Sequence, residues 1–418
     1  MHLLHRPLAK AIVNALHQIF GQNQHTESIV THLLANNPLW GSRDRRLVAA
    51  AIYEIVRHPQ FSDPDFAPLQ LSAKKFKAFF AHNQAECWHL LGAWHILNDN
   101  SLPEWAEFAA INPGTVRQQY AQAQLQRNTR HSLPQYLDQY VSEQLGETTW
   151  EQELSALDQP ASVFIRVNTL KTNAEQLINA LAKNAIVALP LPDMPHTLRI
   201  EQRKNLSTCD AYRKGWFEIQ DAGSQLIVPF CAAKPDMVVI DACAGAGGKT
   251  LQLAAQMNNK GTIVAMDTDK KKLALLEERA QRAGISIIRT RHLSNDKIID
   301  RYRMAADCLL LDVPCSGLGT MRRQADLKWH LSPEKISDLC QQQADILSRY
   351  SHMLHPNGKL TYATCSILPC ENEMQIQNFL QNNNQNSEKK AFKLLKQRQI
   401  SPLQSGFDGF YMAQLSHQ

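Results

Sequence analysis

The stretch MVVIDACAGAGGKT, residues 237–250, decides the fold of this 418-residue chain. An apolar run ends in Asp241, and a glycine-rich loop then leads into a helical pattern. Glycines in such a loop let the backbone approach a ligand closely, and the amide groups at the start of the following helix point toward that ligand. The stretch therefore predicts a strand, a ligand-binding loop and a helix in succession.

Two familiar phosphate-binding patterns do not match this loop. A P-loop requires glycine where the chain has Cys243, and a dinucleotide fingerprint that starts at Gly245 requires glycine where the chain has Thr250. The next apolar run, TIVAMD, ends in Asp267, a position from which a carboxylate can accept both hydroxyls of a ribose. A nucleoside ligand without a central pyrophosphate therefore fits better, and S-adenosylmethionine is the candidate.

Short apolar runs suited to buried strands recur after about residue 225, with helical patterns between most of them. The runs are MVVIDACAG, TIVAMD, ISIIRT, DCLLLDV and GKLTYATCS. Strands that alternate with helices favour a parallel, doubly wound α/β sheet of the Rossmann-like type, in which ligands bind at the carboxyl ends of the strands. Asp241, Asp267, Asp312 and Cys365 all lie at such ends, so we expect them to meet at one edge of the sheet.

The rest of the chain divides into two further regions. Residues 1–130 carry apolar residues at helical spacing and almost no strand pattern, which predicts an all-α domain. Residues 131–224 mix short strand and helix patterns, which predicts a small α+β subdomain linking it to a domain of residues 225–418. Positive charge gathers in GSRDRR, residues 41–46, and in SAKKFKAFF, residues 72–80. A solvated face and an RNA contact both account for this charge.

Composition narrows the class of protein. Hydrophobic residues make up 44% and charged residues 20% of the chain, as in ordinary globular proteins, and the net charge of +5 permits nucleic-acid binding without requiring it. The chain has neither a run of 18 apolar residues nor the pattern of a signal peptide, so we expect no membrane span and a cytoplasmic protein. Its nine cysteines include no C-x-x-C pair, so we expect no metal, and without an export signal we expect reduced thiols. We also expect a monomer.

Two cysteines follow strand patterns at a spacing of 50 residues, and each precedes a serine. Cys315 stands in LLLDVPCSGLG, and Cys365 stands in YATCSILPCENE. One class of methyl transfer needs such thiols, because carbon 5 of cytosine is a poor nucleophile until a thiolate adds to carbon 6 and pushes electron density onto it. A thiol suits this role because a useful fraction ionises near neutral pH. The base must also leave its stack to reach the site.

Pro314-Cys315 together with Thr364-Cys365 is the pairing found in RNA enzymes of this type, and the chain resembles the Fmu/Sun family of bacterial ribosomal RNA (cytosine carbon 5) methyltransferases. The resemblance covers roughly residues 133–415. It rests on FIRVNTLKT, FEIQDAGSQL, DACAGAGGKT, LLLDVPCSGLGTMRRQADLKW, YATCSILPCENE and GFDGFYMAQL. It implies a class I methyltransferase fold, S-adenosylmethionine as cofactor and RNA as partner, with small-subunit ribosomal RNA as the expected substrate.

The resemblance also implies a role for each matching residue. Cys365 would be the nucleophile, and Cys315 would assist release of the methylated product. Asp267 would hold the ribose hydroxyls, and Asp312 would lie between the cofactor and the target base. The glycine loop would wrap the methionine and ribose of the cofactor through Cys243, Ala244, Gly245, Ala246, Gly247, Gly248 and Lys249.

Three departures from the family pattern concern the cofactor site and its surroundings. The family's loop usually reads Ala-Pro-Gly-Gly-Lys where this chain has GAGGK, and the missing proline makes the loop more flexible. The aspartate usual near the adenine is absent: Leu293 or Ser294 stands near that place, and Asn295 and Asp296 are the possible substitutes. Ala325 stands where proline is usual. Weak cofactor affinity is one expected consequence.

Ribosomal RNA members of this family carry an N-terminal helical domain resembling the antitermination factor NusB, and GSRDRRLVAAAIYEIVRHP is similar to a segment of it. This implies an RNA-binding role for residues 1–130, with a bland packing domain as the alternative. In GTMRRQADLKW we expect Arg322, Arg323, Lys328 and Trp329 to grip RNA by phosphate contacts and stacking. Arg166, which is polar within an apolar strand, either borders the active site or makes structural hydrogen bonds.

Three other functions remain open at this level. The same chemistry on transfer RNA is the nearest, and residues 1–130 argue mildly against it. A ribosome-assembly protein that binds RNA and has lost turnover is the second. A nicotinamide-dependent dehydrogenase is the third, and both the missing third glycine and the paired thiols count against it.

Overall fold

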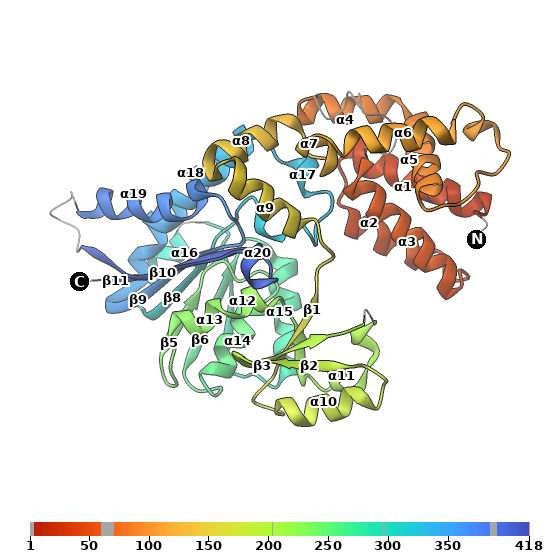
Figure 1. The fold of residues 1–418 in the computed structure, drawn as a ribbon. Coiled ribbons are helices and arrows are strands. Elements are labelled where there is room, and N and C mark those ends of the chain that lie inside the picture. The colour runs from red at the N-terminus through yellow and green to blue at the C-terminus, as the bar shows by residue number, and fades with distance from the viewer. Residues whose placement is uncertain (1–3, 60–70, 203, 296, 385–390, 418) are drawn as a thin grey trace. The chain divides into compact units, whose positions relative to one another are not determined.

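The computed structural model describes residues 4–59, 71–202, 204–295, 297–384 and 391–417 (Figure 1). Its contacts divide the chain into two units. The helical unit comprises Met1–Gln159 and Met321–Ile336, and the sheet unit comprises Pro160–Thr320 and Ser337–Gln418. The division into three domains with boundaries near residues 130 and 224 stays a prediction.

The helical unit packs around α1, whose apolar face of Leu8, Ile12, Leu16 and Ile19 is buried. Pro7 lies in the first turn of α1, where its missing N–H costs no hydrogen bond. The elements of this unit are α1 (Arg6–Gln22), α2 (Thr26–Asn36), α3 (Ser42–Arg57), α4 (Ala73–His82), α5 (Gln84–Leu97), η3 (Ala106–Phe108), α6 (Pro113–Ala123), α7 (Arg127–Arg130), α8 (Gln135–Leu145), α9 (Glu147–Leu157) and α17 (Leu327–His330).

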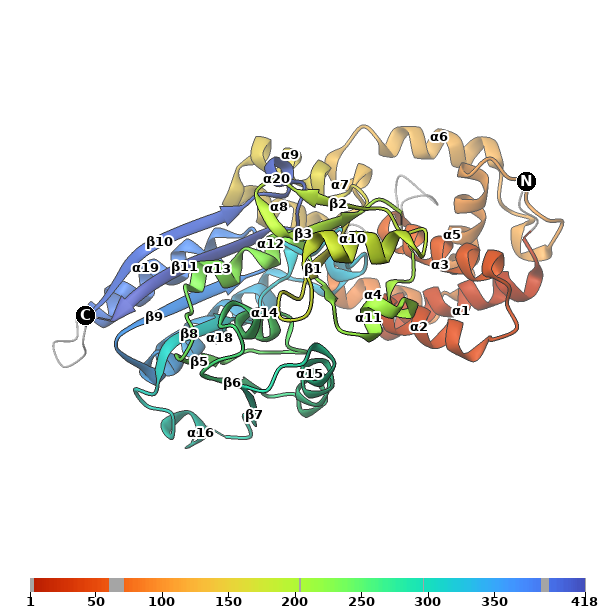
Figure 2. The same ribbon diagram turned by 90° about the horizontal axis from the view of Figure 1, so that it is seen from below.

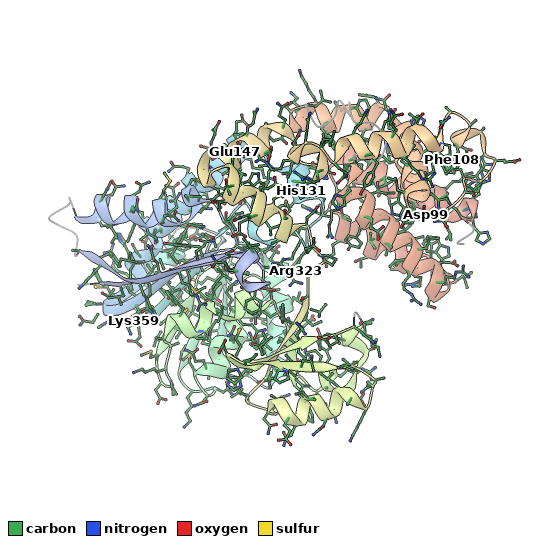
Figure 3. All side chains as sticks on the ribbon, in the orientation of Figure 1. Asp99, Phe108, His131, Glu147, Arg323 and Lys359 are labelled. Atoms are coloured by element: carbon green, nitrogen blue, oxygen red, sulfur yellow. The ribbon has the colours of Figure 1, made fainter. Side chains whose placement is uncertain are left out.

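The segment 321–336 is built into the core of the helical unit. The ring of Trp329 stacks on that of Phe76 with centroids 4.7 Å apart, and its Nε1 donates a hydrogen bond to the carbonyl oxygen of Val56 at 2.9 Å. Lys328 is buried, and its Nζ donates to the carbonyl oxygens of Arg57 and His131, the latter labelled in Figure 3. Burial lowers the pKa of Lys328 to about 7.

The expectation that Lys328 and Trp329 grip RNA is therefore wrong. Both side chains are buried in the core of the helical unit, and Arg322 is buried as well. Among the four residues named for this role, Arg323 alone is exposed (labelled in Figure 3). A lysine can be buried when its amino group donates hydrogen bonds to backbone carbonyl oxygens, and the sequence DLKW gives no sign of this.

A small antiparallel sheet opens the sheet unit, in the order β2-β3-β1-β4. Its strands are β1 (Val163–Val167), β2 (Ala188–Leu191), β3 (Met194–Ile200) and β4 (Phe217–Ile219), and its helices are α10 (Ala174–Ala182) and α11 (Asp210–Arg213), with η4 (Leu206–Thr208). Leu177 and Leu181 of α10 pack against Ile165 and Leu198 of the strands. This confirms the mixed α and β content expected before residue 224.

A seven-stranded sheet forms the rest, in the order β10-β11-β9-β8-β5-β6-β7. The strands are β5 (Val238–Asp241), β6 (Thr262–Asp267), β7 (Ile288–His292), β8 (Ala306–Asp312), β9 (Leu354–Thr364), β10 (Phe392–Ile400) and β11 (Phe410–His417). The strands β9, β8, β5, β6 and β7 are each parallel to their neighbours in this group. In contrast, β11 is antiparallel to β9, and β10 is antiparallel to β11. Figure 2 shows β9, β8, β5 and β6 side by side.

Helices cover both faces of this sheet. The remaining elements of the sheet unit are α12 (Ala222–Gln225), α13 (Ile227–Cys231), α14 (Gly248–Gln256), α15 (Lys270–Ala283), α16 (Lys297–Asp300), η5 (Leu318–Thr320), α18 (Pro333–Tyr350), η6 (Ser351–Met353), η7 (Pro369–Glu371), α19 (Glu373–Asn384) and α20 (Pro402–Ser405). On one face, Ile240 of β5 packs with Leu347 of α18 and Ile376 of α19; on the other, Val239 packs with Ile227 of α13 and Leu253 of α14. The predicted Rossmann-like fold is confirmed. Among the described helices, none is both long and apolar enough to cross a membrane.

Candidate active site

The glycine loop connects β5 to α14 in a conformation that requires glycine. Gly247 has φ of +86°, and a Cβ added there would lie 2.5 Å from Cγ of Leu276. Gly245 also has positive φ, at +53°, and a Cβ built on it or on Gly248 would meet nothing within 4 Å. The backbone at these two glycines is therefore open to close approach by a ligand, as a nucleoside cofactor requires.

Asp267, at the end of β6, is held by two backbone amides. Its Oδ2 accepts a hydrogen bond from the N–H of Gly245 and its Oδ1 accepts one from the N–H of Asp269, both at 2.8 Å. A carboxylate has about four acceptor positions, so two amide donors leave capacity for two hydroxyls. The side chain is thus fixed in orientation and still able to accept the hydroxyls of a ribose.

Lys249 and Asp312 form an ion pair beside the loop. Nζ of Lys249 lies 2.5 Å from Oδ2 of Asp312 and 5.6 Å from the ring centroid of Phe410. Burial by itself lowers the pKa of Lys249, but attraction to Asp312 and to the nearby Cys365 outweighs burial and raises the pKa overall. The lysine is therefore cationic at neutral pH and lies within electrostatic range of the Cys365 sulfur.

The other loop residues contribute mainly backbone. The N–H of Ala244 donates to the carbonyl oxygen of Met266 at 2.9 Å, and the carbonyl oxygen of Ala246 accepts from Nη1 of Arg279 at 2.6 Å. Burial, together with the carboxylates of Asp241, Asp312 and Asp267, raises the pKa of the Cys243 thiol well above its usual value. A neutral thiol at Cys243 is consistent with a contribution through its backbone.

Arg166 makes structural hydrogen bonds and at the same time contacts the glycine loop. From β1 its Nη1 donates to the carbonyl oxygen of Gly248 at 2.7 Å and to Oε1 of Gln220 at 2.5 Å. Arg166 therefore makes structural hydrogen bonds and also borders the candidate site, so the two interpretations of this residue are compatible. The small sheet supplies an arginine that fixes the start of α14.

The structure does not select a partner for the adenine. Leu293 is partly buried, and its N–H donates to the carbonyl oxygen of Asp267 at 2.9 Å. Ser294 and Asn295 are exposed, and Asp296 lies outside the described residues. All four positions stay predictions.

The two cysteine loops lie against each other at the ends of the adjacent parallel strands β8 and β9. The sulfurs of Cys315 and Cys365 are 3.3 Å apart, and the hydroxyl oxygens of Ser316 and Ser366 are 3.2 Å apart. The hydrogen bond with Cys365 and burial together raise the pKa of the Cys315 thiol well above its usual value. Cys315 is thus held as a neutral thiol, hydrogen-bonded to the sulfur of Cys365.

Glu371 and Asn372, which the sequence analysis assigned no role, hold these two loops. Both are buried. Glu371 accepts hydrogen bonds from the N–H and the hydroxyl of Ser316 at 2.7 and 2.5 Å. Asn372 accepts from the hydroxyl of Thr364 at 2.6 Å and donates to the carbonyl oxygen of Ser366 at 3.1 Å. The acid therefore positions the Pro-Cys loop and the amide positions the Thr-Cys loop, and the only sequence signal was their place in CENE.

Replacing Glu371 by glutamine should lower kcat about 100-fold, the scale of a misplaced catalytic group, with little change in cofactor affinity. An amide has one acceptor oxygen where the carboxylate offers two, so one of the bonds to Ser316 or Gln343 is lost. Steady-state kinetics would measure the effect. Glu373→Gln, two residues along the chain, is the matched control, and equal kcat for the two variants would contradict the positioning role.

These features together define a Rossmann-like methyltransferase domain with paired cysteines at its strand ends. The family model described as "16S rRNA methyltransferase RsmB/F" matches residues 230–416, and a second, "Methyltr_RsmF/B-like, ferredoxin-like domain", matches residues 133–207. Ribosomal RNA small subunit methyltransferase B of Photorhabdus laumondii is 31% identical over 72% of this chain and 72% of that protein. The chain belongs to the RsmB/F family of ribosomal RNA methyltransferases, whose members are S-adenosylmethionine-dependent enzymes.

One further curated relative and two solved structures are also similar to this chain, over different shares of its length. A probable ribosomal RNA small subunit methyltransferase B of Synechocystis is 31% identical, and the match spans 62% of this chain and 59% of that protein. The crystal structure titled PH0851 has a TM-score of 0.79 at 24% identity over 100% of both chains, which shows the shared fold. A methyltransferase homolog from Pyrococcus horikoshii has a TM-score of 0.58 at 26% identity, over 66% of this chain and 93% of that one.

Proposed function

We propose that this protein methylates carbon 5 of a cytosine in small-subunit ribosomal RNA through a transient covalent bond to Cys365. The observation that carries the proposal is the 3.3 Å separation of the Cys315 and Cys365 sulfurs. The cofactor loop and the Lys249–Asp312 pair lie at the same edge of the sheet. Covalent activation of a pyrimidine next to a methyl donor needs these groups together.

The cofactor residues fit S-adenosylmethionine in this proposal. Asp267 accepts the ribose hydroxyls, and the open backbone at Gly245 and Gly248 receives the rest of the cofactor. The bound cofactor supplies an electrophilic methyl group on a sulfonium. Cys243, Ala244, Ala246, Gly247 and Lys249 complete the loop around it.

Each cysteine has one role in the chemistry. The Cys365 thiolate, near the Lys249 cation, would form a bond to carbon 6, and the electron pair of the carbon 5–carbon 6 double bond would move toward carbon 5. Carbon 5 would then bond to the methyl group, and the carbon–sulfur bond that breaks would leave its electron pair on the sulfur of the donor. A base then removes the proton from carbon 5, the double bond re-forms, and the sulfur of Cys365 leaves with its bonding pair. In this proposal Cys315, whose sulfur is 3.3 Å from that of Cys365, assists that release, and Asp312 would lie between the cofactor and the target base.

The names of the relatives favour ribosomal over transfer RNA as the substrate, and an RNA-binding, NusB-like role for residues 1–130 is part of the same proposal. We expect a cytoplasmic enzyme. The retained thiols argue against an assembly factor that has lost turnover. A binding-only protein would have no use for the Cys315–Cys365 arrangement.

Replacing Asp267 by alanine should weaken S-adenosylmethionine binding by about 1–3 kcal/mol, because the ribose hydroxyls lose their acceptor. The Gly245 amide loses its partner at the same time. Isothermal titration with the cofactor would measure the change. Asp269→Asn, two positions on at the start of α15, is the control. An unchanged dissociation constant for Asp267→Ala would remove it from the ribose site.

The substrate can be identified by incubating the protein with cofactor carrying a labelled methyl group and with either small-subunit ribosomal RNA or total transfer RNA. We expect label in ribosomal RNA, and 5-methylcytosine on digestion of that RNA. Mapping 5-methylcytosine in cells with and without the gene gives the nucleotide. Label in transfer RNA alone would replace the substrate, and label at another base position would overturn the covalent mechanism.

A further inference from the structure

Two histidines and one aspartate converge in the helical unit, whereas the residues that the mechanism uses belong to the sheet unit. Nδ1 of His25 lies 3.2 Å and Nε2 of His330 lies 3.0 Å from the same oxygen, Oδ2 of Asp326. The three atoms all lie within 4.8 Å of one another. We propose that His25, Asp326 and His330 bind a divalent transition-metal ion, with Zn²⁺ as the preferred ion.

The two distances from the histidine nitrogens to the Asp326 oxygen fit a tetrahedral ion. Zinc ligands at 2.0–2.2 Å from the metal are about 3.3 Å from each other in a tetrahedron. The two nitrogen-to-oxygen distances are within a few tenths of an ångström of that value. Small side-chain rotations would therefore admit the ion. Imidazole nitrogens with one carboxylate oxygen suit Zn²⁺, whereas Mg²⁺ and Ca²⁺ prefer oxygen donors alone.

The second nitrogen of His330 supports a ligand role. Nδ1 of His330 lies 2.8 Å from Oδ1 of Asn23, so the ring has an acceptor oxygen on each side. When Nδ1 donates its proton to Asn23, the neutral ring points a lone pair from Nε2 at the Asp326 carboxylate. A cation between the two resolves that repulsion. A ligating histidine that donates its other N–H to an oxygen is the usual arrangement around protein metals.

The burial of the three residues indicates an open fourth position. The side chains of Asp326 and His330 are 8% and 7% exposed, whereas that of His25 is 76% exposed. The two inner ligands are thus fixed by the core, and the ion would keep one coordination position facing solvent for water or an added ligand.

The proposed ion would join parts of the chain that lie far apart in sequence. His25 immediately precedes α2, and some 300 residues later Asp326 immediately precedes α17 and His330 is the last residue of α17. A bond across so long a separation restricts the unfolded chain and therefore favours the folded helical unit. The absence of C-x-x-C pairs led us to expect no metal, and that argument has no bearing on a histidine–aspartate site assembled from remote segments.

A metal-free network is the alternative. Oδ2 of Asp326 also accepts the N–H of Thr26 at 3.3 Å, so the carboxylate caps α2 without an ion. A protonated His330, or an Asn23 amide turned to donate, would then satisfy the ring. This alternative needs no metal, and metal titration of the full-length protein separates the two.

Titration of the metal-stripped protein with Co²⁺, a spectroscopic substitute for Zn²⁺, should give one site per chain with visible absorption that Zn²⁺ abolishes and Mg²⁺ does not. His25→Gln should weaken this affinity by about tenfold or more, the least expected from disturbing a metal site. Its side chain is exposed, so the variant should fold normally. His330→Gln should weaken the affinity at least as much.

His32→Gln, an exposed histidine on α2, is the matched control and should bind as the unaltered protein does. Zn²⁺ should also raise the midpoint of thermal unfolding of the unaltered protein and of His32→Gln, with a smaller rise for His25→Gln. Absence of Co²⁺ absorption would overturn the proposal. So would equal affinity in His25→Gln and the unaltered protein.

Discussion

The variant Cys365→Ala should lose methyl transfer by roughly 10⁴-fold or more, the scale of removing a covalent nucleophile. Without the thiolate, carbon 5 of the pyrimidine stays unreactive toward the methyl donor. The cofactor is held by the glycine loop and Asp267, so its dissociation constant should not change. Incorporation of labelled methyl into RNA measures the first quantity, and calorimetric titration measures the second.

Cys340→Ala is the control for this loss, because Cys340 is a partly exposed cysteine on α18 to which the mechanism assigns no role, and its Sγ donates a hydrogen bond to the carbonyl oxygen of Cys370 at 3.4 Å. It should retain full turnover. Undiminished methylation by Cys365→Ala would show that Cys365 is not the nucleophile. Loss of cofactor binding in that variant would mean that the loop had been disturbed, and the kinetics would then say nothing about the sulfur.

The variant Cys315→Ala should trap the enzyme on its RNA. The neutral Cys315 thiol lies 3.3 Å from the sulfur of Cys365, and we assign it to the release step. Without it the bond between Cys365 and carbon 6 should persist after methylation. Product formation should fall about 10²- to 10⁴-fold, the usual contribution of a positioned acid or base. A band of reduced mobility on a denaturing gel would reveal the protein–RNA adduct.

The double variant Cys315→Ala, Cys365→Ala identifies the bond in that adduct. It should form no band of reduced mobility, because the attacking sulfur is gone. Persistence of the band would place the covalent bond on another residue. Normal product formation by Cys315→Ala without any adduct would remove Cys315 from the mechanism.

The sheet and the ends of its strands could be predicted because each strand is an apolar run that stops at a polar residue. Asp241, Asp267 and Asp312 end β5, β6 and β8, and Cys365 directly follows β9, as the pattern indicated. Parallel strands bring such ends to one edge by topology alone. The residues that we expect to act on cofactor and base could therefore be proposed from local sequence and the family motifs.

The supporting contacts could not be predicted, because they join residues that only the fold brings together. Glu371 reaches Ser316 across 55 positions, and Lys328 reaches the carbonyl of Arg57 across 271. A charged side chain in a polar stretch is typical of the surface, and this prior gave the wrong role to Lys328. The convergence of His25 and His330 on Asp326 was hidden for the same reason.

The passage of the chain into the helical unit at Met321 and out of it at Ile336 has a consequence for modularity. A fragment that begins after Gln159 would not fold well on its own. Trp329 and Ala325 would lose the helices that bury them and would become an exposed apolar surface prone to aggregation. A single cut after Gln159 therefore does not separate the two units cleanly, because residues 321–336 would stay with the sheet unit. A shortened form that keeps only the sheet unit would have to lack residues 321–336 as well as the first 159 residues.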